Sequence, residues 1–359
     1  MKIHAFCLLS LLAVQSHAAM NPPAISPHEG DWIDKNFHFK SGATLPELRL
    51  HYRTLGSPTR NSAGEITNAI LILHSTGSSS EQFMKPQFAQ VLFGKGQALD
   101  QNRYYIVMPD SIGHGRSSKP SDGLGPRFPA YDYDDMVLAQ YDLLTKGLGI
   151  AHLRLLMGTS MGCMHSWVWA ESYPKFMDGV MPLGCLPVPI AGRNRMIRQM
   201  MVQAIHRDVA WNGGNYTQEP EASLRIVAQI LMIASSGAQE LQEIAPDPKT
   251  ADKYLADATD HKMEGLDAND LIFALDSSRN YDPSPRLSSI VAPMIAVNSA
   301  DDFINPPELH IAEPMMRQVK GAKFVLIPVS NATHGHLTHT WAIFWQQYLR
   351  QLLEQTSRG

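Results

Sequence analysis

The sequence predicts an α/β fold in which helices cover both faces of a mostly parallel central sheet. Short apolar runs alternate with segments of helical periodicity along most of the chain, and this alternation is typical of parallel strands connected by helices. The composition agrees, because 44% of the 359 residues are hydrophobic and only 18% are charged. A chain of this length and composition can bury a large core.

The composition also excludes several classes of function. The 30 basic and 34 acidic residues leave a formal net charge of -4, so we expect no nucleic-acid partner. The 3 cysteines are too few for a scaffold held together by disulfides, and no Cys-x-x-Cys pair indicates a metal site. We therefore expect neither a metal nor a cofactor.

Residues 1–19 are predicted to be a secretory signal peptide. Lys2 precedes an apolar run of about ten residues, and Ala18 and Ala19 supply a cleavage site. The run is too short for a permanent membrane span, which needs about 20 apolar residues. We expect a periplasmic or secreted protein with no membrane anchor after cleavage; a buried N-terminal helix is the alternative.

Residues 20–186 are predicted to form the first part of the α/β core. An irregular, proline-containing arm over 20–30 is followed by strands and helices in alternation. The expected strands are 37–40, 48–54, 69–73, 104–108, 153–157 and 179–183. The expected helices are 134–148 and a segment running from Ser160 to about Tyr173, and 119–129 is expected to be a loop.

Residues 187–282 are predicted to form a helical insertion that covers the sheet. Their periodicity is mainly helical, with breaks at Gly213-Gly214 and at 246–248. The core resumes over 283–359. There we expect strands at 294–298 and 324–327 and a final helix over 337–353.

The strongest chemical motif is Gly158-x-Ser160-x-Gly162, between a predicted strand and a predicted helix. This context is required for a nucleophile elbow, in which a tight turn presents a serine at the carboxyl edge of a sheet. The flanking glycines leave room for that turn. The alternative is an ordinary glycine-rich connection, but the strand and helix on either side favour Ser160 as a nucleophile.

A serine hydroxyl needs a base, and the base needs a carboxylate partner. His336, which follows the last strand, is the preferred base. His334 could serve instead, and its alternative role is a hydrogen bond within the loop; His339 lies nearby. Asp302 is the preferred acid, and Asp301 would then cap the loop. The order serine, aspartate, histidine matches the α/β-hydrolase fold, which we therefore predict.

The expected tetrahedral intermediate needs N–H donors for its oxyanion. One is predicted to be the backbone N–H of Met161, directly after the nucleophile. The other is expected from the loop after strand 69–73, near Ser75 or Thr76, and we assign it to Thr76.

Several other residues have plain structural interpretations. Trp167 and Trp169 are expected in the core, and Cys163 is expected to be a small buried packing residue, although a disulfide with Cys185 is geometrically possible. The glycines of 113–117 do not match a dinucleotide-binding motif. Four arginines at the start of the insertion are expected on a solvated helix face, with an anionic substrate as the alternative: Arg193, Arg195, Arg198 and Arg207.

The sequence resembles the homoserine O-acetyltransferase family of the α/β-hydrolase superfamily over most of the mature chain. The matching motifs are Phe128-Pro129, Asp135-Met136-Val137, Ala139-Gln140, 148–150, 158–162, Ala204-Ile205, Asp208, Trp211, Gly214, Tyr216, Asp302, Pro306-Pro307 and Gly335-His336. The resemblance implies that Ser160 is acylated, that His336 is the base and that Asp302 is its partner. It also implies a lid formed by the insertion, transfer of acetyl from acetyl-CoA to homoserine, and a possible homodimer.

Three departures from the family pattern favour water as the acyl acceptor. Val202 stands where the family has the arginine that holds the homoserine carboxylate, and Cys163 replaces a second glycine after Ser-Met. The predicted signal peptide directs the chain out of the cytosol, where acetyl-CoA is not expected. Losing a charge-assisted contact weakens recognition of an amino acid.

We therefore predict an exported serine hydrolase that acts on a small-molecule acyl substrate such as an ester or a lactone. The alternative is an O-acyltransferase that uses homoserine or another hydroxyl acceptor. Hydrolysis of a carbon–carbon bond next to a ketone uses the same three residues. A catalytically silent binding protein is disfavoured by the complete set of Ser160, Asp302 and His336.

Overall fold

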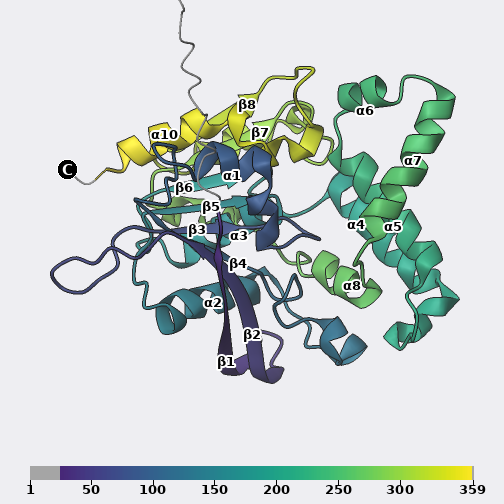
Figure 1. Cartoon of the computed structure of the whole chain (residues 1–359), viewed down its shortest axis with the longest axis horizontal. Helices are drawn as coiled ribbons and strands as arrows, with labels where there is room; N and C mark the ends of the chain where they lie inside the picture. Colours follow the sequence, from purple (N-terminus) through teal and green to yellow (C-terminus); the bar gives the residue numbers. More distant parts are fainter. Residues whose placement is uncertain (1–24, 358–359) are drawn as a thin grey trace, which may run out of the picture.

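The computed structural model of the chain describes residues 25–357, so the predicted signal peptide lies outside the described residues. Eight strands form one sheet in the order β1-β2-β4-β3-β5-β6-β7-β8 (Figure 1). Pairing is antiparallel between β1 and β2 and between β2 and β4, and parallel elsewhere. The strands are β1 (His28–His38), β2 (Thr44–Leu55), β3 (Ala69–Leu73), β4 (Tyr105–Pro109), β5 (Leu155–Thr159), β6 (Val180–Leu183), β7 (Ile295–Ser299) and β8 (Lys323–Ile327).

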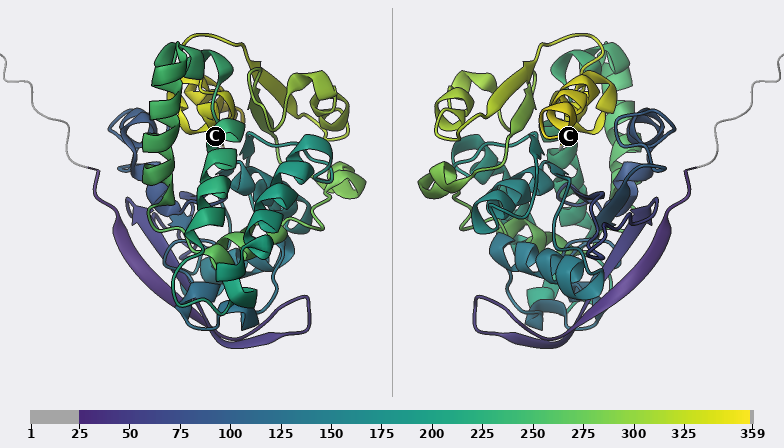
Figure 2. Two further views of the ribbon diagram at one scale, coloured as in Figure 1. Left: turned by 90° about the vertical axis from the view of Figure 1, so that its right-hand side faces the viewer. Right: turned by 90° about the vertical axis from the view of Figure 1, so that its left-hand side faces the viewer.

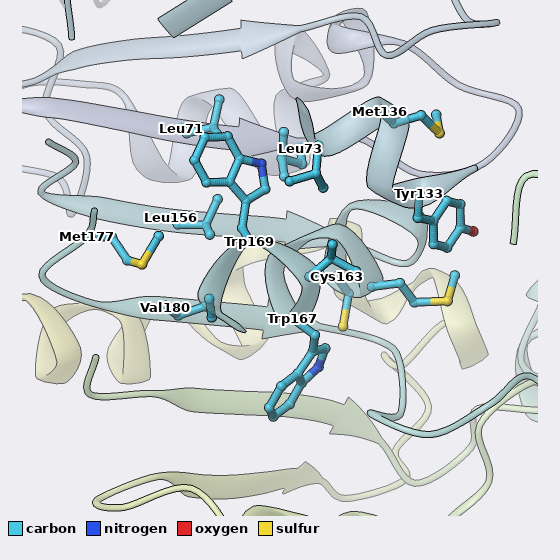
Figure 3. Close-up of a cluster of buried hydrophobic side chains, with 14 of the residues drawn as sticks. Leu71, Leu73, Tyr133, Met136, Leu156, Cys163, Trp167, Trp169, Met177 and Val180 are labelled. Atoms are coloured by element: carbon cyan, nitrogen blue, oxygen red, sulfur yellow. The ribbon is translucent and has the colours of Figure 1, made fainter. Parts of the chain in front are cut away.

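Helices cover both faces of this sheet, as predicted. Those of the α/β core are α1 (Pro86–Leu92), α2 (Tyr133–Asp142), α3 (Met161–Ser172), α9 (Ala312–Met316) and α10 (Gln346–Gln355). Successive strand residues point to opposite faces, so Ile70 and Ile72 pack with α1 and α10 while Leu71 and Leu73 pack with α2 and α3. Figure 3 shows the second of these layers, with Trp169 of α3 lying over the sheet.

The helix-rich part of the chain packs beside the carboxyl edge of the sheet (Figure 1, right, and Figure 2, left). Its helices are α4 (Gly192–Arg207), α5 (Glu221–Ser235), α6 (Ala238–Ile244), α7 (Pro248–Met263) and α8 (Ala268–Asp276). Helices α4, α5 and α8 share a small apolar cluster of their own, made by Met201, Ile205, Leu224, Val227, Ala268, Leu271 and Leu275. This separate cluster lets the helices pack together without extending the main core.

The edge strand β1 departs from the sequence prediction. It begins at His28, inside the segment expected to be an irregular arm, and it ends at His38 rather than at residue 40. Most of its side chains are exposed or only half-buried, so the strand carries no apolar run that would mark it. Its regular pairing with β2 supplies the backbone hydrogen bonds that its composition does not reveal.

The expected final helix is broken into shorter pieces. Two 3-10 turns, Gly335–Thr340 and Ala342–Phe344, precede α10. The chain is extended at Trp341, and the indole N–H of Trp345 donates to the carbonyl oxygen of His339 at 3.1 Å. The expected helix over 134–148 likewise ends at Asp142 and continues as a π turn, Leu143–Gly147. Tertiary contacts set these local conformations, which periodicity alone does not show.

Strand β2 begins at Thr44, four residues before the predicted start at residue 48, and the remaining boundaries differ from the prediction by at most two residues. The loop expected over 119–129 contains two short 3-10 turns, Pro120–Asp122 and Gly125–Arg127. Within the described residues, no helix has the length and apolar character needed to cross a membrane. In the same part of the chain, no group of three or more His, Cys, Asp or Glu side chains is arranged to hold a metal ion.

Candidate active site

Ser160 lies on a strained turn between β5 and α3. Its backbone has φ 51° and ψ -103°, a conformation that an L-residue rarely adopts. The N–H of Ser160 donates to the carbonyl oxygen of Leu183 on β6 at 2.8 Å, and the N–H of Gly162 donates to that of His74 at 2.9 Å. These bonds hold the turn against the two neighbouring strands, so the strain is maintained by the sheet.

The two glycines of the motif are required by close backbone approach. A Cβ at Gly158 would overlap the carbonyl of Gly162, and a Cβ at Gly162 would overlap the carbonyl of Leu73 on β3. Backbone atoms held in a helix or a sheet cannot move aside as a flexible side chain can. The Gly-x-Ser-x-Gly spacing is therefore the sequence consequence of bringing α3 directly onto the sheet.

Three predicted site residues lie in one hydrogen-bonded chain. The Oγ of Ser160 lies 2.9 Å from Nε2 of His336, and Nδ1 of His336 lies 2.7 Å from Oδ2 of Asp302. His336 is 6% exposed and Asp302 is 2% exposed. An Nδ1–H that donates to Asp302 leaves Nε2 free to accept the Ser160 proton, which is the arrangement that a general base needs.

Asp302 is held as a carboxylate by its surroundings. Its Oδ1 accepts the backbone N–H groups of Ile304 at 2.7 Å and Asn305 at 3.0 Å. Burial alone would raise the pKa of Asp302, but His336 and the Asn305 hydrogen bonds outweigh it and lower the pKa below 3.8. The charge on Asp302 therefore persists near neutral pH and fixes the orientation of His336. Sequence analysis did not single out Asn305, although it lies three residues after Asp302.

Asp301 has a different position from Asp302. It accepts the hydroxyl proton of Ser299 and, at 3.0 Å, the backbone N–H of Gly335. These contacts connect the loop after β7 to the loop that carries His336. Asp301 thus positions the histidine loop, and Asp302 is the aspartate that contacts the imidazole of His336.

The other two histidines of this loop make separate contacts. Nδ1 of His334 lies 2.6 Å from Glu240 of α6, and the His334 ring stacks on Trp341 with centroids 4.0 Å apart. His339 lies edge-on to His336, and burial together with His336 lowers the pKa of His339 to about 3. Of the three histidines, His336 alone contacts Ser160 within the described residues.

The two predicted oxyanion donors lie at the same edge. Met161 follows the nucleophile as the first residue of α3, and Thr76 lies two residues after His74, whose carbonyl accepts from Gly162. The N–H of Ser75 is already taken by Gln82 at 3.1 Å. Within the described residues, no hydrogen bond takes up the N–H of Met161 or of Thr76. The role of these two groups as oxyanion donors stays a prediction.

Cys163 is not a simple packing residue, which corrects our preferred interpretation. It forms a disulfide with Cys185, and the two Cα atoms are 5.8 Å apart. Cys185 follows β6, beside the strand that precedes the nucleophile, so the fold brings the two thiols within bridging distance. The predicted core positions of Trp167 and Trp169 are confirmed, since both side chains are fully buried.

The expectation of a solvated arginine face is wrong for one of its four members. Arg193 and Arg207 are exposed and Arg195 is half-buried, whereas Arg198 is only 8% exposed. Arg198 shares the inward stripe of α4 with Met201 and Ile205. Helical spacing from those two apolar residues would have indicated its burial.

A family model described as the alpha/beta hydrolase fold matches residues 68–340. A homoserine O-acetyltransferase of Chloroherpeton thalassium is 30% identical over 325 residues, covering 83% of this chain and 81% of its own. Two solved structures share the fold at 21% identity and 91% coverage of this chain. They are an acetylester hydrolase from Corynebacterium glutamicum (TM-score 0.79, 96% of that chain) and a homoserine O-acetyltransferase from Bacillus anthracis (TM-score 0.78, 97% of that chain).

The fold and the family model together define an α/β hydrolase. The chain belongs to the homoserine O-acetyltransferase-like group of that family, as its motifs predicted, and it is an enzyme that transfers an acyl group or hydrolyses an ester.

Proposed function

We propose that the protein is an exported serine hydrolase that cleaves a small ester through an acyl-enzyme on Ser160. The observation that carries the proposal is the hydrogen-bonded chain from Ser160 through His336 to Asp302, at the edge of the sheet where two backbone N–H groups are free. A nucleophile, its base, the partner of the base and oxyanion donors are the components of acyl transfer.

The reaction follows from this geometry. His336 accepts the Ser160 proton at Nε2 while Oγ attacks the ester carbonyl, and the N–H groups of Met161 and Thr76 bind the resulting oxyanion. When the intermediate collapses, the carbon–oxygen bond to the alcohol breaks and His336 returns its proton to the leaving alcohol. Water then repeats the sequence on the acyl-enzyme, which releases the acid and restores Ser160. Asp302 stabilises the imidazolium in both halves.

Export is supported by two independent features. The first 19 residues have the composition of a secretory signal, and Cys163 pairs with Cys185. Disulfides persist in the periplasm and outside the cell but are rare in the cytosol. Expression of the full chain, followed by N-terminal sequencing of the protein from the extracytoplasmic fraction, tests this directly. A product that begins near Met20 is expected, and an uncleaved cytosolic product would contradict export.

Acyl transfer to a hydroxyl acceptor is the second candidate. It is favoured by the relatives named homoserine O-acetyltransferase, one of which is 30% identical. However, Val202 packs against the apolar cluster of the insertion at the position where the family carries its carboxylate-binding arginine. The apolar side chain of Val202 cannot make the contact that the family arginine makes at this position, which supports water as the acceptor.

One experiment separates the two candidates. The mature protein is incubated with an acetyl donor, with and without homoserine, and the products are measured by mass spectrometry. Free acetate in both samples is expected. O-acetylhomoserine in the second sample would instead establish the transferase.

The nucleophile is tested with a fluorophosphonate label. Wild-type protein is expected to carry one label, and Ser160→Ala is expected to carry none and to lose about 10⁴–10⁶-fold in kcat. Circular dichroism of Ser160→Ala should match the wild type, which shows that the loss is chemical. Unchanged labelling of Ser160→Ala would overturn the assignment.

A further inference from the structure

A buried arginine lies on the inward stripe of α4 without an acidic partner. Arg198 is 8% exposed, and the other inward residues of this helix, Met201 and Ile205, are apolar. Within the described residues, no carboxylate oxygen lies within 4.0 Å of the Arg198 guanidinium. Burying a charged side chain is unfavourable unless it is paired, so an unpaired guanidinium at this position calls for a bound anion.

Arg198 also has more donors than the protein takes up. Its Nε donates to Oδ1 of Asn194 at 3.0 Å and its Nη1 donates to Oγ of Ser278 at 3.2 Å. The Ser278 hydroxyl proton is itself donated to the carbonyl of Leu275 at 2.9 Å. Neutral oxygens therefore accept from one edge of the guanidinium, the neutral phenol of Tyr133 lies beside it, and no carboxylate takes up its remaining N–H groups within the described residues.

The phenol of Tyr133 is a second buried donor, and it lies beside the guanidinium of Arg198. Tyr133 is 2% exposed, and its phenol oxygen lies beside Arg198 and Ser278 without a hydrogen bond of regular geometry within the described residues. Burial raises the pKa of Tyr133, and the neighbouring Arg198 and Ser278 act against that rise. The phenol therefore keeps its proton, and Tyr133 and Arg198 together present a positive charge and several N–H and O–H donors.

The pair lies at the edge of the sheet that carries the nucleophile. Tyr133 begins α2 and packs edge-on against His165 of α3, with centroids 4.6 Å apart, and Figure 3 shows Tyr133 beyond the ends of the strands. Near the start of α4, Arg193 lies 3.9 Å over the ring of Phe303, the neighbour of Asp302. Arg198 follows about 7.5 Å further along the axis of the same helix, which thus meets the loop of Asp302 near its start and carries Arg198 on its inward side.

We propose that Arg198 and Tyr133 form an anion subsite that binds a carboxylate of the ester hydrolysed at Ser160. The inference rests on the proposed function and adds a substrate class, namely small esters that carry a free carboxylate. One guanidinium balances a single negative charge, and its planar N–H groups match the two oxygens of a carboxylate. A doubly charged phosphate would leave one charge unpaired in this buried position.

The turnover test compares matched charged and neutral esters. Mono-4-nitrophenyl glutarate and its methyl ester differ in the charge of the acyl part, and 4-acetoxybutyrate and its methyl ester differ in the charge of the alcohol part. For at least one pair, Arg198→Met should lower the ratio of kcat/KM for the charged ester to that for the neutral ester by about 10–100-fold. Tyr133→Phe should lower the same ratio by a smaller factor.

The controls distinguish recognition from simple packing. Arg207→Met removes an exposed arginine from the end of the same helix and should leave both ratios unchanged. If Arg198 only ties α4 to Ser278, Arg198→Met will slow both members of each pair equally. Unchanged ratios in both pairs would therefore overturn the subsite.

A binding measurement keeps the subsite separate from the chemistry. Monomethyl glutarate is titrated into Ser160→Ala by saturation-transfer NMR, and Arg198→Met in that background should weaken binding by at least about tenfold. No binding to Ser160→Ala, or equal binding to the double variant, would contradict the subsite. If the wild type hydrolyses no ester while binding depends on Arg198, the proposed function fails and the subsite stands.

Discussion

The carboxyl edge of the sheet and the helical segment from α4 to α8 hold their residues in different ways. At the edge, Ser160 and Asp302 are each fixed by several backbone and side-chain hydrogen bonds, and the surrounding core is continuous. The helices have a small apolar cluster and meet the core through contacts such as Glu240–His334 and Asp270–Ser121. The chemistry thus lies where geometry is strongly determined, and at the proposed anion subsite we expect a single substitution to change recognition.

The two regions meet most closely at a pair of glycines. Gly335, the residue before His336, has φ 57°, and a Cβ there would lie 2.5 Å from the backbone of Ser236 between α5 and α6. A Cβ at Gly237 would lie 2.9 Å from the backbone nitrogen of Gly335. The connection between α5 and α6 therefore packs directly on the loop that carries His336. A movement of these helices would displace that loop and with it the imidazole.

The largest effect that tests this contrast is expected at Gly162. Gly162→Ala places a Cβ on the Leu73 carbonyl, which the sheet cannot move, and should destabilise the protein by about 3–5 kcal/mol. Gly265→Ala, in the helical segment, meets no atom within 4 Å and should cost only the strain of its positive φ, about 1–2 kcal/mol. Urea denaturation measures both, and equal losses would remove the distinction between the two regions.

The disulfide should have the next largest effect. Cys163→Ala with Cys185→Ala opens a loop with a sequence separation of 22 and should lower the free energy of unfolding by about 2–4 kcal/mol. A reductant should lower the urea midpoint of the wild type and leave that of the double variant unchanged. A wild-type midpoint that does not respond to reduction would show that the bridge does not stabilise the segment leading into α4.

Acid should destabilise the core through its buried neutral histidines. Burial lowers the pKa of His74 and His165, and with a neighbouring histidine it lowers that of His114 to about 3. The unfolded chain binds these protons below its ordinary pKa of about 6.5. Stability is therefore complete above that pH and falls below it, by at most about 1.4 kcal/mol per pH unit for each group.

This pH dependence is measured by urea denaturation between pH 7 and pH 5. His165→Gln should flatten the slope, since glutamine takes no proton in this range. His261→Gln is the matched control, because His261 is exposed on α7 in the helical segment. An unchanged slope in His165→Gln would mean that His165 is not held neutral in the folded protein.

The smallest effect is expected at the ion pair between the two regions. His334 and Glu240 are partly exposed, so Glu240→Gln should change the free energy of unfolding by less than about 1 kcal/mol and leave kcat/KM within about fivefold. The stacking of His334 on Trp341 does not involve Glu240 and is expected to remain. Thermal unfolding measures the change in stability and ester hydrolysis measures kcat/KM. A large loss of activity would show that the contact between His334 and Glu240 positions His336.

Much of the core was predictable because its signals are local. Five buried residues in Ala69–Leu73 mark a strand by themselves, and Gly158 and Gly162 mark the elbow because close backbone approach forbids a side chain there. Strand β1 was predicted only in part. Its side chains are largely exposed, so no apolar pattern marks it, and its pairing with β2 depends on the other strand.

The sequence by itself determined the residue types of the site and their order along the chain, because a nucleophile elbow and its base require particular side chains at particular turns. Only the tertiary structure decided which aspartate meets His336, that Cys163 pairs with Cys185, and that Arg198 is buried without an acid. Asp301 and Asp302 are neighbours with the same chemistry, and loop packing alone turns one toward Gly335 and the other toward the imidazole. Such choices depend on contacts between separate segments, 34 residues apart for Asp302 and His336 and 22 apart for the two cysteines, and no local pattern contains them.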